Sequence, residues 1–217
     1  MSRSTLHRMT PRSGAHGRRI VILLMIAAAG VLLAAPATAG AHVAKKHKKE
    51  YKANLEAYGK SMMLHKDAYD RTQVDVQNAA DRIGPLLGSQ DPVDQENLNG
   101  LQLDEGVNAR TWAYLWPKLK ASFDKGIDDF CKKALPWFRT KADKQDLRDG
   151  TAGIKRAFDQ LFKDGFGGIA MEEQTLSEAV KLDGLVTFYQ QYEDATKARG
   201  QAETRFNRAI AILNDLQ

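Results

Sequence analysis

Lysine and histidine side chains gather in residues 42–52, which carry five lysines and one glutamate. Within this stretch Lys45, Lys46, Lys48 and Lys49 form a compact basic cluster. Such a cluster can bind polyanions, for example lipopolysaccharide, acidic wall polymers or nucleic acid, through charge alone. A solvated basic tail has the same composition, so both interpretations stay open.

Gly40, Ala41 and His42 offer a second chemistry, on condition that Gly40 is the first residue of the mature chain. A free amine, two deprotonated backbone amides and the imidazole of a third-position histidine then place four nitrogens in one plane. Square-planar nitrogen ligation suits Cu(II) or Ni(II). If the chain instead begins at His42, the amine and imidazole form the chelate, with His47 as a further ligand. Third-position histidines also arise by chance, so the pattern predicts binding and not a biological role.

The motifs of the common enzyme classes are missing from this sequence. It contains no G-x-S-x-G, H-E-x-x-H or P-loop pattern, and His65 is preceded by Met62 where a di-iron bundle needs glutamate. Residues 95–100 are similar to part of a calcium loop, but Gly106 stands where the bidentate glutamate belongs. We therefore expect a protein that is not an enzyme, with no cofactor beyond Cu(II) or Ni(II) at its N-terminus.

Residues 1–39 have the three parts of a cleavable secretory signal peptide. Their five charged residues are all arginines, and a run of 16 small or apolar residues follows from Ile20 to Ala35. Ala37-Thr38-Ala39 fits the cleavage pattern, and a cut after Ala41 is the alternative. The run is shorter than the roughly 20 residues that span a bilayer, although an uncleaved anchor is the competing interpretation. We expect a periplasmic or secreted protein with no transmembrane helix after cleavage.

Removal of the signal changes the electrostatic balance. The whole chain has 32 Lys+Arg and 27 Asp+Glu, so without the five signal arginines the mature chain is formally neutral. The basic balance is therefore no evidence for specific nucleic-acid binding. The single cysteine, Cys131, excludes an intramolecular disulfide, so the fold must depend on packing. Whether Cys131 is buried or bridges two molecules stays open.

Helical periodicity carries most of the structural information. Apolar residues from Tyr51 to Ile83 alternate at spacings of four and three, which predicts one long helix with a coiled-coil seam. A second seam, Phe188 to Leu213, predicts a long final helix that begins near Ile169, with Glu172 and Glu173 in its first turn.

Shorter helices are expected between these two. One begins at Asp91-Pro92 and stops near Gly100. A second has a kink at Pro117 and is broken by Pro136. A third ends at Gly165-Phe166 in the arrangement of a Schellman cap.

These patterns predict an all-α protein, an elongated helical bundle with two long coiled-coil-like terminal helices and shorter helices between. We expect residues 1–39 to be the cleaved signal, 40–50 a basic flexible segment and 51–217 one helical-bundle domain. The expected function is an exported binding or structural module that associates with a protein partner, itself or anionic surface polymers. A membrane-active or lipid-binding protein and an extracytoplasmic copper-binding protein are the alternatives. The sequence identifies no partner, oligomeric state or biological role.

Overall fold

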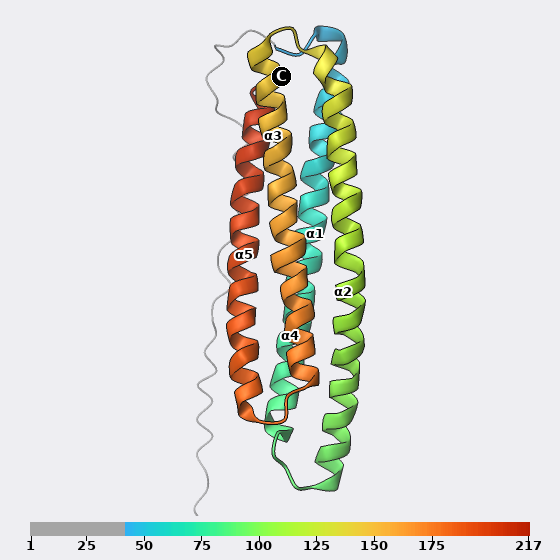
Figure 1. The fold of residues 1–217 in the computed structure, drawn as a ribbon, viewed down its shortest axis with the longest axis vertical. Coiled ribbons are helices and arrows are strands. Elements are labelled where there is room, and N and C mark those ends of the chain that lie inside the picture. Colours follow the sequence, from blue (N-terminus) through green and yellow to red (C-terminus); the bar gives the residue numbers. More distant parts are fainter. Residues whose placement is uncertain (1–41) are drawn as a thin grey trace, which may run out of the picture. The chain divides into compact units, whose positions relative to one another are not determined.

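The computed structural model describes residues 42–217, which form four long helical segments packed as a bundle (Figure 1). The helices are α1 Lys48–Ile83, α2 Pro92–Ala134, α3 Lys141–Gln160, α4 Gly167–Ser177 and α5 Leu182–Asn214. A π-helical turn, Leu161–Phe166, joins α3 to α4, so that these two run on as one segment. The predicted all-α bundle is confirmed. The predicted signal peptide, residues 1–39, lies outside the described residues.

The two predicted seams face the core of the bundle. The buried seam residues are Tyr51, Leu55, Met62, Tyr69, Val76 and Ile83 on α1, and Phe188, Ala195, Ala202, Phe206, Ala209 and Leu213 on α5. Full burial of one large apolar side chain stabilises a fold by roughly 1.5–3 kcal/mol, so these seams supply much of the packing free energy. Coiled-coil supercoiling of the two helices stays a prediction.

Helix α2 differs from the prediction, because it runs unbroken through Gly100, where the sequence predicted a helix end. Its 43 residues make it longer than α1 and α5, so the expectation of shorter helices between the terminal ones is wrong for this segment. Gly100 does not adopt a positive φ, and a helical glycine costs only about 1 kcal/mol relative to alanine. Pro117 lies on the exposed face, where the carbonyl that loses its amide donor can be hydrated.

The helix predicted to end at Gly165-Phe166 also continues. A Cβ atom at Gly165 would lie 3.1 Å from a ring carbon of Tyr69, and one at Gly168 would lie 2.9 Å from the Cβ of Ala195. Gly165 therefore allows α1 to approach the α3–α4 segment closely, and Gly168 does the same for α5. Neither glycine terminates a helix. The chain turns after Ser177 instead, so the last helix begins at Leu182.

A column of aromatic rings holds the π-helical turn against α2 and α3. Phe158 stacks on Phe123 with 4.6 Å between ring centroids, and Phe162 and Phe166 continue the stack. Trp112 of α2 closes it, 4.7 Å from Phe166. The column fixes where α4 leaves the turn, and therefore the position of every α4 side chain described below.

Candidate functional site

Residues 42–47, which we name the N-terminal strap, lie across one end of the bundle. The amide of Val43 donates to the carbonyl of Leu216 over 3.2 Å, and the Val43 side chain is buried. The His47 ring stacks on Trp137 with a centroid distance of 4.7 Å. The strap thus joins the start of α1 to the α2–α3 connection and to the C-terminus.

The flexibility predicted for residues 40–50 stays a prediction, although the strap makes the contacts just described. That prediction used the lysines at the start of α1, which oppose the helix dipole. The structure offsets this local cost through contacts far along the chain, with Trp137 and Leu216. Such contacts leave no periodic signal in the sequence.

His42 is also engaged, because its Nδ1 lies 2.6 Å from Oδ1 of Asp143. A hydrogen bond with Thr140 holds the pKa of the Asp143 carboxyl below its ordinary value, and His42 adds to this effect. Gly40 and Ala41, the other members of the predicted copper site, lie outside the described residues. The chelate ring that starts at the His42 amide closes through Nδ1, so a metal bound there would have to displace Asp143.

Two of the four lysines of the predicted polyanion site belong to the strap, and the other two lie in the first turn of α1. Lys45, Lys46 and Lys49 are exposed and Lys48 is half-buried. Within residues 42–217 none of the four forms an ion pair with an acid. Their charge is therefore free to act on a partner.

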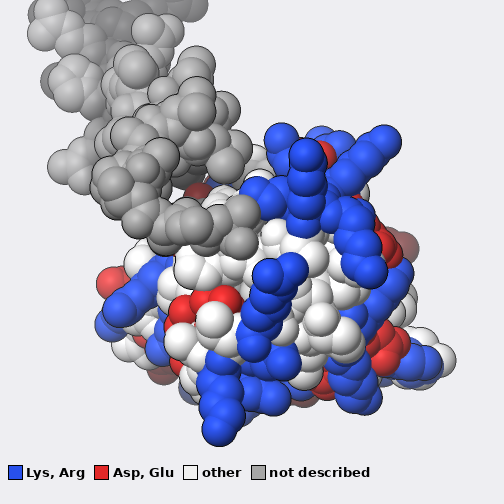
Figure 2. Space-filling model, turned by 90° about the horizontal axis from the view of Figure 1, so that it is seen from above, with Lys and Arg blue, Asp and Glu red and all other residues white. Residues whose placement is uncertain are grey.

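Further basic residues from α2, α3 and α5 reach the same end, which we name the cationic end (Figure 2). It comprises residues 42–52, 128–148 and 208–217, which hold twelve basic and six acidic residues. Three of its acids are already engaged, since Glu50 pairs with Lys133, Asp143 with His42 and Asp128 with Lys155. The view along the bundle shows blue side chains around a paler centre.

The opposite end of the bundle has the reverse charge. Residues 75–101 and 169–190 hold nine acidic and two basic residues. The described part of the molecule is therefore polarised along its helices. Charge separation of this kind orients a protein toward a polyanion before contact.

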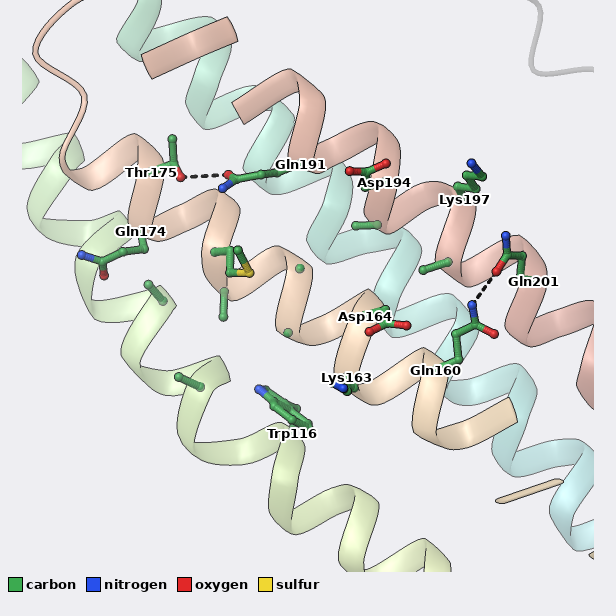
Figure 3. Close-up of a pocket in the computed structure, with 18 of the residues that line it drawn as sticks. Trp116, Gln160, Lys163, Asp164, Gln174, Thr175, Gln191, Asp194, Lys197 and Gln201 are labelled. Atoms are coloured by element: carbon green, nitrogen blue, oxygen red, sulfur yellow. Dashed lines mark hydrogen bonds between the residues drawn. The ribbon is translucent and has the colours of Figure 1, made fainter. Parts of the chain in front are cut away.

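A groove of about 970 Å³ lies over α4, between α2 and α5 (Figure 3). Its floor is made by small residues, chiefly Gly167, Gly168 and Ala170, and Trp116 forms one wall. Figure 3 shows two bridges beside it: Thr175 donates to Gln191 over 2.8 Å, and Gln160 donates to Gln201 over 2.6 Å. The volume is at the upper end of the range of small-molecule sites, about 300–1,000 Å³.

The groove selects no single ligand charge, because Lys163 and Lys197 alternate with Asp164 and Asp194 along it. Sequence reasoning missed it, since its lining comes from helices far apart in the chain and consists largely of glycine and alanine. The glycines after Phe162 are the one available signal in the sequence, and the first of them, Gly165, has the pattern of a helix end.

Three glutamates inside the bundle were also missed. Glu172 and Glu173, expected in an exposed first turn, are 0% and 2% exposed, and Glu105 is 8% exposed. Burial raises the pKa of Glu105 and Glu172 to about 7 and that of Glu173 to about 8. Among residues 42–217 no group of three His, Cys, Asp or Glu side chains is placed to hold a metal ion.

The structure also places His65 and Cys131, two other residues considered in the sequence analysis. The Nδ1 of His65 lies 2.7 Å from the carbonyl of Ser61, and its ring meets Phe123 edge-on. Cys131 is half-buried. Of the helices described, none combines the length and the apolar character that a membrane span requires.

No protein-family model, curated protein or solved structure matches this chain. Its function must therefore be argued from the chemistry of the cationic end, the groove and the buried acids alone.

Proposed function

We propose that this protein is an exported helical-bundle binding module that attaches to anionic polymers through its cationic end. The observation that supports the proposal is the convergence of Lys45, Lys46, Lys48 and Lys49 with the basic residues of α2 and α3 on one end of the bundle. Export rests on the signal pattern of residues 1–39, and the long apolar seams supply the rigid bundle that carries the cationic end.

The arrangement favours a polymer over a small anion. The exposed lysines project from the strap and from the first turn of α1, and none of them lines the groove over α4. Separate exposed charges recognise the charge density of a repeating polyanion, and each contact contributes little alone. Acidic wall polymers and lipopolysaccharide have such repeating charges.

The opposite charge of the other end adds orientation to this binding. A polyanion repels the end that holds seven acidic residues besides the buried Glu172 and Glu173, and attracts the end that holds twelve basic ones. The bundle would then stand on an anionic surface by its cationic end, with α4 and its groove away from that surface.

Retention of the exported protein on heparin resin tests the proposal. Wild-type protein should bind at low salt and elute steeply as salt rises, since counterion release dominates such contacts. Replacing Lys45, Lys46, Lys48 and Lys49 together by glutamine should abolish retention, while circular dichroism shows an unchanged helix content.

A matched control separates the cationic end from net charge. Lys60, Lys125, Lys163 and Lys181 are exposed and form no ion pair within the described residues. Glutamine at these four positions removes the same charge and should leave most of the retention. Wild-type protein that passes through the resin at low salt, or two variants that lose retention equally, would contradict the proposal.

A further inference from the structure

Helix α4 places two adjacent carboxyl groups inside the bundle. Both carboxylate oxygens of Glu172, one of Glu173 and one of Glu105 on α2 have no hydrogen-bond partner among the described residues. The fully buried hydroxyl of Tyr69, beside Glu172, also lacks one. A buried carboxylate without compensation is costly, whereas a neutral carboxyl is tolerated far better. Their positions therefore favour the protonated form.

Among the described residues, Arg82 of α1 faces Glu105 and acts to lower its pKa, but burial outweighs this effect. The other groups that face the three acids are Tyr69 from α1, Asp104 from α2 and Tyr192 from α5, and the two tyrosines in turn face Asp70 and Arg199. Arg199 lies 3.5 Å from Asp70 and 3.8 Å from Glu203, so its charge is used there. Glu173 faces Glu105, so ionisation of one raises the cost of ionising the other.

The direction of the pH dependence follows from burial. Burial raises the pKa of these carboxyls from an ordinary 4.5 to between about 7 and about 8. Between pH 4.5 and 8 the packed state therefore holds more protons than an opened state. The protonated carboxyls stabilise the packed state fully below pH 4.5. This stabilisation is lost progressively as the pH rises, and the loss is complete above the raised pKa values.

We propose that Glu105, Glu172 and Glu173 form a proton-dependent switch that keeps α4 packed in the bundle while they are neutral and releases it when they ionise. Release is local because α4, Gly167–Ser177, is bounded by the π-helical turn and by the turn before α5. Its other face forms the groove floor, so release of α4 also removes the groove.

Amide hydrogen exchange of the exported protein between pH 6 and 9 tests the switch, after correction for the intrinsic exchange rate. Protection of the α4 amides should fall more than tenfold over this range, since a single group with a packed-state pKa of about 7 already gives that factor. Amides of α3, whose first turn lies at the cationic end, should change far less.

Replacing Glu172 and Glu173 together by glutamine should flatten the pH dependence of α4 protection. Glu178→Gln, an exposed acid just after α4, is the matched control and should behave as wild type. If the double variant does not fold, Glu105→Gln alone should weaken the dependence. Protection that falls equally in α3 and α4, or glutamine variants that keep the wild-type profile, would overturn the switch.

Discussion

The contact between α3 and α5 at Gly153 makes a prediction that the geometry fixes closely. A Cβ atom at Gly153 would lie 2.8 Å from the Cβ of Ala209. Carbon atoms in a packed core are separated by about 3.5–4.0 Å. Ala209 has no side-chain torsion that could move its methyl group aside, so Gly153→Ala must push the two helices apart.

The cost of Gly153→Ala is best measured against the same substitution at a glycine with open space around it. Overpacking of a core contact costs about 1–3 kcal/mol, while alanine exceeds glycine as a helix former by about 1 kcal/mol. Nothing lies within 4 Å of a Cβ atom at Gly100, so Gly100→Ala has only the second effect. We expect Gly100→Ala to stabilise the protein by about 1 kcal/mol. The Gly153→Ala variant should be less stable than the Gly100→Ala variant by about 1–3 kcal/mol.

Urea denaturation followed by circular dichroism gives both free energies of unfolding. Adding Ala209→Gly to Gly153→Ala removes the clash, and the double-mutant cycle should show favourable coupling between the two sites. Equal stability of Gly153→Ala and Gly100→Ala would refute the close approach of α3 and α5. Destabilisation by Gly100→Ala would show that α2 ends there, since alanine is strained in a left-handed helix cap.

Two further predictions concern the cationic end. Thr140 caps α3, its hydroxyl accepting from the Asp143 amide over 3.0 Å, so Thr140→Ala should lower the free energy of unfolding by about 1 kcal/mol in urea; an unchanged midpoint would contradict the cap. If Gly40 is the first mature residue, Cu(II) titration followed by visible absorption should show one equivalent bound, lost in His42→Ala. Because Asp143 holds His42 Nδ1, Asp143→Ala should bind copper more tightly, and weaker binding would argue that Asp143 is itself a ligand.

Periodicity predicted the parts of the fold that depend on local sequence. The apolar residues of the α1 seam are buried, and Asp91 accepts from the Val93 amide over 2.8 Å at the predicted helix start. Gly100 has open space around it and is tolerated inside α2, whereas Gly165 faces Tyr69 of α1. A glycine that ends a helix and a glycine that admits a neighbouring helix look alike until the partner helix is placed.

The candidate sites depend even more on tertiary structure. Local sequence showed the lysines of the strap, but their convergence with the ends of α2 and α3 needed the bundle. The buried acids were missed because Glu172 and Glu173 resemble ordinary acids of a first helical turn. Only the continuation of the chain through Gly165 turns them inward, toward Tyr69 and Glu105.

The two halves of the bundle should therefore respond differently to pH. The half near α4 holds the unpaired buried carboxyls, and it should loosen as they ionise above pH 7. The cationic end is tied by the strap, by the Thr140 cap and by the Tyr51 hydroxyl, which donates to the Leu213 carbonyl over 2.8 Å. Heparin retention should thus persist at pH 9 while α4 is released, so polymer binding and the α4 switch can fail independently in experiment.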